Sequence, residues 1–119
     1  MLRFYGYQKC STCRDAAAWL RARGIEFQEI AIRETPPTLK ELKAMLRSRD
    51  GQMTRLFNTS GMDYRAQGIK DKLPALSEDE AMALLNGHGN LVKRPFVIDE
   101  KAGVFLLGFK EPEWQAALG

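Results

Sequence analysis

The sequence predicts an α/β fold in which a small mixed sheet is flanked by helices and a helical insertion separates the second strand from the third. An extended apolar run, a helical pattern and a second extended run follow one another at the N-terminus. Capped helical patterns occupy the middle of the chain, and two short apolar runs joined by a turn precede a last helical pattern. Because period-two patterns predict strands and 3.6-residue patterns predict helices, the element order is β-α-β, helices, β-β-α.

The N-terminal part is predicted to be a strand–helix–strand unit. Residues 2–7 form an apolar, strand-like run, and residues 12–23 place alanine, tryptophan and leucine side chains at helical spacing. Gly24 supplies the end of the helix, and residues 25–30 form the second extended run. A strand, a crossover helix and a strand of these lengths predict two parallel strands with a right-handed connection.

Residues 36–89 are predicted to form the helical insertion. Thr38 and Glu41 make a capping box, in which the threonine oxygen and the glutamate carboxylate each bind a backbone N–H at the helix start. Ser77 and Glu80 repeat this motif at the start of a second helix. The apolar stripe expected on the first of these helices consists of Leu39, Leu42, Met45 and Leu46.

The C-terminal part is predicted to add two strands and a helix. Residues 96–98 and 104–107 are short apolar runs, and the polar segment 99–103 between them ends in glycine, as hairpin turns often do. Residues 111–118 predict the last helix. The 119 residues contain no internal repeat or linker, so we expect residues 1–119 to form a single domain.

The segment Cys10-Ser11-Thr12-Cys13 lies at the junction of the first strand and the first helix. Free N–H groups and the positive end of the dipole at a helix start favour a thiolate over a thiol, and Lys9 and Arg14 add positive charge beside the pair. The thiolate is the nucleophilic form. Cys10 is therefore the predicted attacking residue, and Cys13, one turn further along, the predicted resolving residue.

Two other interpretations of the cysteine pair stay open at this point. The cysteines could be half of a zinc site, although a closed structural site needs four ligands and His88 is the only histidine. They could also be inert core residues or a fixed structural disulfide. A Cys-x-x-Cys motif in a chain without a secretory signal pattern favours a pair that cycles between dithiol and disulfide.

Composition limits the expected location and partners. The formal net charge of +3 is mild and no basic block stands out, so we expect no direct nucleic-acid binding. No apolar run approaches the roughly 20 residues that cross a bilayer, and the N-terminus lacks a signal-peptide pattern. We expect a cytoplasmic monomer that needs no membrane and no metal.

Two further segments are candidates for the site. Arg94-Pro95 precedes the third strand, and an X-Pro bond is where a cis peptide is most common, so this turn could present backbone beside the cysteines. Alternatively, Pro95 is a trans residue that begins the strand, and Arg94 is solvated. Asn58-Thr59-Ser60-Gly61 could bind an oxyanion or simply connect two helices.

Four motifs occur in a fixed order along the chain. They are Cys-x-x-Cys-Arg at 10–14, Pro-Pro-x-x-x-Glu-Leu at 36–42, Asn-Thr-x-Gly-x-x-Tyr-Arg at 58–65 and Lys-Arg-Pro-x-x-Ile-Asp at 93–99. With these motifs the chain resembles the ArsC/Spx family, thioredoxin-like proteins related to arsenate reductase. The resemblance covers residues 2–118 and implies a thioredoxin-like form of the predicted fold.

The resemblance to arsenate reductases implies roles for particular residues. Cys10 falls where those enzymes keep the thiolate that attacks arsenate, and Arg94 falls where they keep an arginine that binds the oxyanion, beside a cis-proline that here is Pro95. Asn58 and the segment 107–110 fall where they have two further arginines, which this chain lacks. Each charge-assisted bond contributes about 1.5 to 3 kcal/mol, so the resemblance implies weak arsenate binding.

Two other positions resemble Spx, a redox-sensing regulator that binds RNA polymerase. Cys13 completes a Cys-x-x-Cys pair like the one whose disulfide switches Spx, and Gly51 lies where Spx has a glycine at its polymerase contact. A glycine that ends a helix would explain Gly51 equally well.

These observations predict a thiol–disulfide oxidoreductase, similar to arsenate reductase, with a Cys-x-x-Cys redox pair. Glutathione or thioredoxin is the expected reductant, a glutaredoxin is a further expected thiol partner, and no bound cofactor is expected. The alternative is an Spx-like redox-sensing transcriptional regulator that binds RNA polymerase. The predicted catalytic residues are Cys10, Cys13 and Arg94, and the predicted substrate-binding residues are Lys9, Ser11, Thr12, Asn58 and Pro95.

Overall fold

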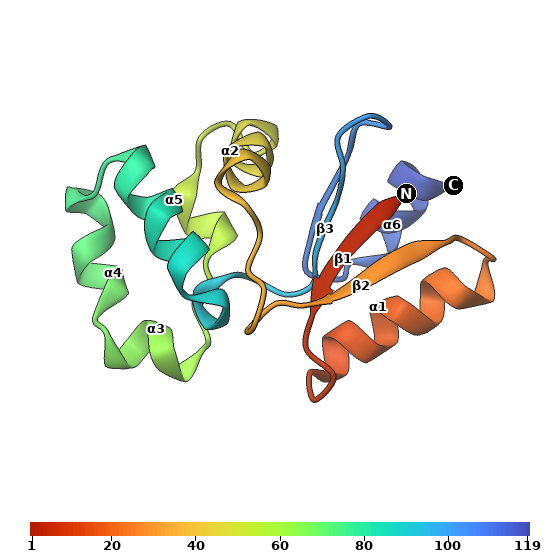
Figure 1. Cartoon of the computed structure of the whole chain (residues 1–119), viewed down its shortest axis with the longest axis horizontal. Helices are drawn as coiled ribbons and strands as arrows, with labels where there is room; N and C mark the ends of the chain where they lie inside the picture. Colours follow the sequence, from red (N-terminus) through yellow and green to blue (C-terminus); the bar gives the residue numbers. More distant parts are fainter. The chain divides into compact units, whose positions relative to one another are not determined.

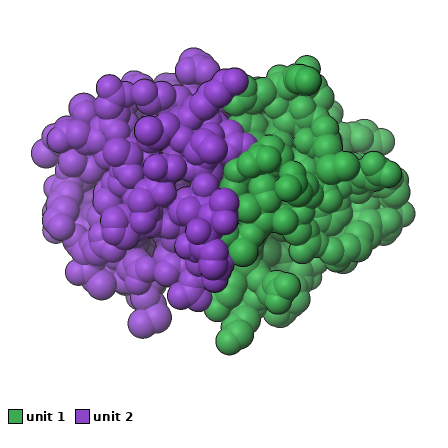
Figure 2. All heavy atoms as spheres, in the orientation of Figure 1, with its two compact units in different colours: residues 1–31, 94–119 green, residues 32–93 purple.

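The computed structural model describes residues 1–119 and contains two compact units (Figure 2). The sheet unit comprises Met1–Ala31 and Arg94–Gly119, and the helical unit comprises Ile32–Lys93. Each unit is described by itself below. None of the helices has the length and apolar character needed to cross a membrane.

The sheet unit contains four strands and two helices (Figure 1). They are β1 (Leu2–Gly6), α1 (Ser11–Ala22), β2 (Phe27–Ala31), β3 (Phe96–Asp99), β4 (Val104–Leu107) and α6 (Glu111–Leu118). The strand order is β2-β1-β3-β4. β1 pairs in parallel with β2 and antiparallel with β3, and β3 pairs antiparallel with β4. The predicted mixed sheet is therefore confirmed, and the second strand begins at Phe27, two residues later than predicted.

One face of this sheet carries the core of the unit. Side chains alternate along β1, so Leu2 and Phe4 point to this face. α1 and α6 both pack on it, since the same apolar cluster contains Cys13, Ala16, Ala17, Trp19, Leu20 and Trp114. Tyr5 and Phe96 lie on neighbouring strands of the other face, and their buried rings meet edge to face at 5.7 Å between centroids. A sheet buried in this way holds the end of β1 and the start of α1 in fixed positions.

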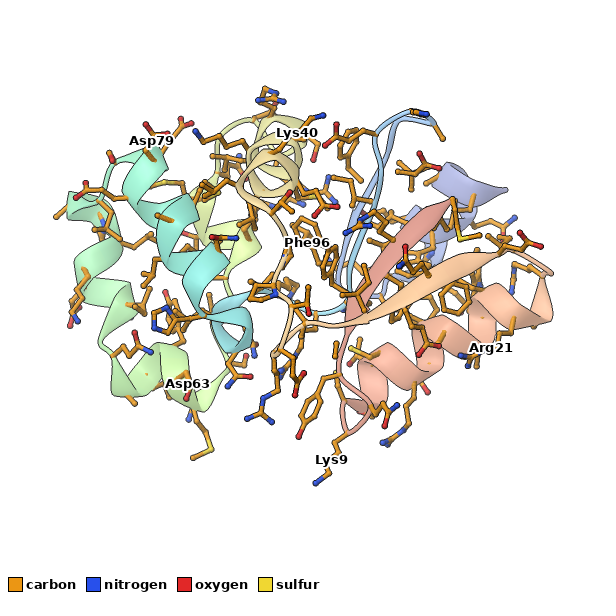
Figure 3. The ribbon with its side chains drawn as sticks, in the orientation of Figure 1. Lys9, Arg21, Lys40, Asp63, Asp79 and Phe96 are labelled. Atoms are coloured by element: carbon orange, nitrogen blue, oxygen red, sulfur yellow. The ribbon has the colours of Figure 1, made fainter.

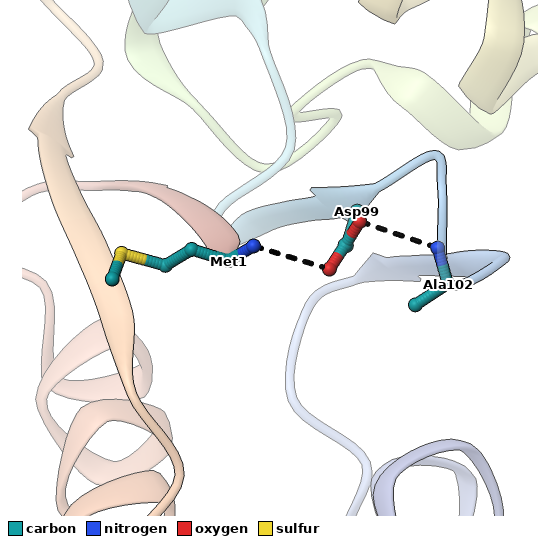
Figure 4. A network of polar contacts seen from close by, with 3 residues as sticks. All are labelled: Met1, Asp99 and Ala102. Carbon is teal, nitrogen blue, oxygen red and sulfur yellow. Dashed lines mark hydrogen bonds and ion pairs between the residues drawn. The ribbon is translucent and has the colours of Figure 1, made fainter.

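The hairpin between β3 and β4 is closed by Asp99 (Figure 4). Its Oδ1 accepts a hydrogen bond from the Ala102 N–H at 3.3 Å, and its Oδ2 lies 3.5 Å from the N-terminal ammonium of Met1. Gly103 has φ of +71°, a conformation that glycine adopts without a steric penalty. These contacts confirm the turn predicted at 99–103.

The helical unit contains the predicted insertion. Its helices are α2 (Leu39–Ser48), α3 (Met62–Ala66), α4 (Ile69–Lys72) and α5 (Glu78–Gly87), with the 3-10 helices η1 (Met53–Leu56), η2 (Leu73–Ala75) and η3 (Gly89–Leu91). Both predicted capping boxes are present, at Thr38 and at Ser77. An ion pair of 3.0 Å between Lys43 and Asp79 joins α2 to α5.

One expectation for the insertion was wrong, and one part of it was predicted without detail. Leu39 was expected in the apolar stripe of the first helix, but as the first residue of α2 it is 43% exposed, while Leu42, Met45 and Leu46 are buried. Residues 61–76, for which the sequence predicted a helical insertion without separate helices, contain α3, α4 and η2. These helices have only five, four and three residues, too few for a helical repeat to be recognised in the sequence.

The two capping boxes provide a stability test of the helical unit. We expect Thr38→Ala and Ser77→Ala each to lower the free energy of unfolding by about 1 kcal/mol, because each leaves helix N–H groups without an acceptor. The backbone and then the side-chain hydrogen bond with Ser77 lower the pKa of Glu80, so the contribution of the Glu80 carboxylate to that cap should be lost as pH falls through this lowered pKa. Urea unfolding measures both effects. Thr35→Ala, an exposed threonine outside any cap, should be nearly neutral, and an equal loss in all three variants would contradict the capping argument.

Candidate functional site

Cys10 is the N-cap residue of α1 and is half-buried. Its backbone N–H donates to the Tyr7 carbonyl at 3.0 Å, and its own carbonyl accepts from the Arg14 N–H at 3.0 Å. The Cys10 side chain makes no capping hydrogen bond, and the first turn of α1 contains no acidic residue. The sulfur is therefore placed at the positive end of the helix dipole with no carboxylate in the first turn to offset it.

Cys13 lies one turn further along α1 and is only 3% exposed. The pKa of Cys13 is raised to about 12, first by burial and then by a hydrogen bond with the Cys10 side chain and by the charge of Cys10. A hydrogen bond with the Tyr7 backbone and the positive charge of Arg94 act in the opposite direction. Both cysteines are free thiols in this structure. The pair is thus asymmetric, with one accessible sulfur and one buried, protonated sulfur in hydrogen-bond contact.

Gly6, the last residue of β1, lies beside the Cys13 sulfur and the Phe4 ring. A Cβ atom at this position would lie 3.4 Å from the Cys13 sulfur and 2.7 Å from the Phe4 ring. The first distance is an ordinary contact, but the second is shorter than real Cβ contacts, so a side chain at this position would displace the Phe4 ring beside the buried sulfur.

The Arg94-Pro95 peptide bond is cis, as the sequence suggested. Pro95 is buried, and its carbonyl accepts a hydrogen bond from the Gly108 N–H at 2.9 Å, which ties the turn to the segment after β4. Arg94 is half-buried, and its guanidinium carbon lies 5.5 Å from the centroid of the Tyr7 ring. Because Arg94 also acts on the pKa of Cys13, the structure brings Arg94 and the cysteine pair together within the sheet unit.

The remaining predicted substrate-binding residues fall into two groups. Lys9, Ser11 and Thr12 are exposed around the start of α1, and the Lys9 side chain points away from the protein (Figure 3). Asn58 belongs to the helical unit, where its N–H donates to Leu91 at 2.7 Å and its carbonyl accepts from Gly61 at 3.0 Å. These bonds shape a turn between η1 and α3, as expected of a connector.

Sequence reasoning missed Tyr7, which contacts Cys10, Cys13 and Arg94. It was counted only as the end of the first strand, whereas β1 ends at Gly6 and Tyr7 begins the loop to α1. Its position just before the Cys-x-x-Cys motif was the one available signal. No group of three or more His, Cys, Asp or Glu side chains is arranged to hold a metal ion.

The difference between the two sulfurs predicts selective alkylation. Iodoacetamide at about pH 8 should modify Cys10 and leave Cys13 unmodified, because a buried thiol with a raised pKa is not a nucleophile at that pH. Peptide mass spectrometry locates the label, and protein unfolded in urea, where both cysteines should react, is the control. Preferential labelling of Cys13 in the folded protein would refute the assignment of the two roles.

Comparisons with known proteins identify the family of this chain. The model of the ArsC family matches residues 5–117. YusI of Bacillus subtilis, a protein named as uncharacterized, is 47% identical over 115 residues, which are 96% of this chain and 95% of YusI. The global transcriptional regulator Spx of Enterococcus faecalis is 32% identical over 113 residues, 95% of this chain and 83% of Spx.

A solved structure shows the same similarity at the level of the fold. A Streptococcus mutans protein described as a possible arsenate reductase superposes with a TM-score of 0.84 at 42% identity, covering 92% of each chain. The chain belongs to the ArsC family and has its thioredoxin-like fold.

Proposed function

We propose that the protein is a thiol–disulfide oxidoreductase in which Cys10 attacks and Cys13 resolves. The observation that carries this proposal is the asymmetry of the pair. Cys10 is accessible at the start of α1, whereas Cys13 is buried and kept protonated in hydrogen-bond contact with it. Such an arrangement supports attack by one sulfur at a time.

The first step is thiol–disulfide exchange. The Cys10 thiolate attacks a substrate disulfide, a Cys10–substrate disulfide forms, and one substrate sulfur leaves as a thiolate that takes a proton from solvent. Two of the effects that raise the pKa of Cys13 come from Cys10, its hydrogen bond and its charge. Both change once the Cys10 sulfur is bonded to substrate, so the mixed disulfide favours ionisation of Cys13.

The second step releases the reduced substrate. The Cys13 thiolate attacks the Cys10 sulfur, the internal Cys10–Cys13 disulfide forms, and the second substrate sulfur leaves. Two electrons have then passed from the protein to the substrate. Two glutathione molecules, or one reduced thioredoxin or glutaredoxin, return the pair to the dithiol form, and no bound cofactor takes part.

Arsenate is expected to be a poor substrate. Binding of an oxyanion would depend on Arg94, because Asn58 is neutral and the segment after β4 has Lys110, an exposed residue at the start of α6, in place of an arginine. Charge-assisted hydrogen bonds contribute about 1.5 to 3 kcal/mol each, so the lack of the two arginines that the resemblance implies should weaken arsenate binding by several kcal/mol.

A second candidate is a redox-sensing transcriptional regulator. It is favoured by the Spx relatives, which are 29 to 32% identical to this chain over 113 residues. In that case the Cys10–Cys13 disulfide would be the signal, and the output would be a contact with RNA polymerase. Gly51, which follows α2 with φ of +75°, is the position to replace in a test of polymerase binding.

Turnover assays distinguish these functions. The protein is incubated with glutathione and glutathione reductase, or with thioredoxin and thioredoxin reductase. NADPH consumption is followed with a glutathionylated peptide disulfide or with arsenate as the substrate. We expect turnover of the disulfide, little turnover of arsenate, and none with Cys10→Ser. Two results together would favour the regulator: the protein turns over no disulfide, and only its oxidised or only its reduced form binds RNA polymerase.

Replacement of Arg94 tests its part in the reaction. Arg94→Ala should retain the fold but lower kcat/KM for glutathione, which is anionic, by about 10-fold, the effect of losing one charge-assisted bond. The rate with dithiothreitol, which is neutral, should stay near that of the wild type. Equal losses with both thiols would show that Arg94 is structural and does not bind the anion.

A further inference from the structure

Tyr7 contacts all three predicted catalytic residues, Cys10, Cys13 and Arg94. Its carbonyl accepts the Cys10 N–H at 3.0 Å, which fixes the N-cap of α1. Its backbone also forms a hydrogen bond with the Cys13 sulfur, and this bond lowers the pKa of Cys13, the effect of an N–H donor on a thiolate. One residue thus contacts the attacking and the resolving cysteine through its main chain.

The side chain of Tyr7 makes the third contact. The guanidinium carbon of Arg94 lies 5.5 Å from the centre of the Tyr7 ring, within the distance of about 6 Å at which a cation is attracted to an aromatic face. Arg94 comes from the turn before β3, more than eighty positions later in the sequence. The ring contact therefore joins this distant segment to the cysteine loop.

The orientation of the arginine determines what its charge can do. An arginine side chain has several rotatable bonds, and holding it in one geometry costs conformational entropy. Contact with a half-buried ring restricts the guanidinium, whose planar fork can then receive a carboxylate or another anion. The Arg94 charge already reaches Cys13, so an anion bound to it lies close to the pair.

We propose that Tyr7 is a positioning residue, whose ring holds the Arg94 guanidinium so that anionic thiols and disulfides are directed to Cys10. The proposal deepens the proposed function and rests on it for the reaction concerned. In this proposal Tyr7 and Arg94 together select anionic substrates. The effect of replacing Tyr7 therefore depends on the presence of Arg94. Tyr7 itself takes no part in bond making.

Alkylation of Cys10 tests this without any turnover. Iodoacetate and iodoacetamide react with a thiolate by the same displacement and are similar in size, but only iodoacetate is anionic. The ratio of their rates at Cys10, measured by peptide mass spectrometry, therefore reports how well the site attracts an anion. A change in thiolate reactivity alone alters both rates and leaves the ratio unchanged.

We expect Arg94→Ala to lower this ratio about 2- to 5-fold, the range of a partly exposed cation–anion or cation–π contact. Tyr7→Leu should produce most of the same loss, and Tyr7→Phe, which keeps the ring, should retain the wild-type ratio. The double variant Tyr7→Leu/Arg94→Ala should resemble Arg94→Ala alone, because the ring acts only through the arginine. Lys101→Ala removes an exposed charge from the β3–β4 turn and should leave the ratio unchanged.

Two results would overturn the proposal. In the first, Arg94→Ala lowers the ratio of the iodoacetate rate to the iodoacetamide rate, but Tyr7→Leu keeps the wild-type ratio. In the second, Arg94→Ala itself leaves this ratio unchanged. Circular dichroism verifies the fold of each variant, and Tyr7→Gln replaces Tyr7→Leu if the latter is unfolded. If the protein does not catalyse thiol–disulfide exchange, the turnover assay contradicts the proposed function, while the alkylation ratio still decides the role of Tyr7.

Discussion

Cys13→Ser is expected to accumulate a disulfide between Cys10 and the substrate, while Cys10→Ser is expected to accumulate none. In Cys13→Ser the first exchange can proceed, but no second sulfur is present to displace the substrate from Cys10. In Cys10→Ser the accessible nucleophile is lost, and the remaining cysteine is buried with a raised pKa. Turnover of a disulfide should fall by a factor on the order of 10³ or more, the scale seen when a catalytic nucleophile is removed.

Intact mass spectrometry after a brief exposure to a glutathionylated peptide measures the adduct. Cys13→Ser should gain the mass of one disulfide-bound substrate, and the wild type should instead lose two hydrogens as its internal disulfide forms. Dithiothreitol should remove the adduct. If Cys10→Ser forms the adduct at the rate of Cys13→Ser, the two roles must be exchanged.

Trp114→Ala is expected to destabilise the sheet unit by about 3 to 5 kcal/mol, the range for removal of a large buried aromatic side chain. Trp114 is fully buried on α6, and its ring meets those of Trp19 and Phe109 edge to face at 5.9 and 5.0 Å. Its Nε1 donates to the Gly108 carbonyl at 3.0 Å. The substitution therefore leaves a cavity and an unpaired carbonyl in the core that supports α1.

Urea unfolding followed by circular dichroism measures this loss. Trp114→Phe separates its two causes, because phenylalanine fills most of the cavity but cannot donate to Gly108, so it should cost about 1 to 3 kcal/mol. Ala117→Ser, an exposed change on the same helix, is the matched control and should be nearly neutral. A Trp114→Ala variant as stable as this control would show that α6 does not contribute to the core.

Local signals in the sequence determined the helix starts, the type of sheet and the position of the candidate site. The capping pairs Thr38–Glu41 and Ser77–Glu80 marked the starts of α2 and α5, because each helix start binds its own nearby side chains. The order of strands and helices predicted the mixed sheet, since a right-handed crossover and a hairpin leave few other arrangements. The Cys-x-x-Cys motif at a strand–helix junction located the candidate site, because the position of this site depends on a few adjacent residues.

Other features were decided only by the tertiary structure. The exposure of Leu39 depends on what lies beside the first turn of α2, and α3 and α4 are too short to form by propensity alone. Gly89 packs against a segment that is distant in the sequence, since a Cβ there would lie 1.8 Å from the Ile32 carbonyl.

The candidate site shows the same division. Cys10 and Cys13 are three residues apart, so the helix alone brings their sulfurs together, and the sequence predicted both. The helix start also predicted different roles for the two cysteines, but the burial that raises the pKa of Cys13 and the contact of Tyr7 with Arg94 could not be predicted in this way. Burial of Cys13 and the approach of Arg94 result from packing of α1 and β3 in one unit, which depends on residues from both ends of the chain, and no local pattern records contacts over such sequence distances.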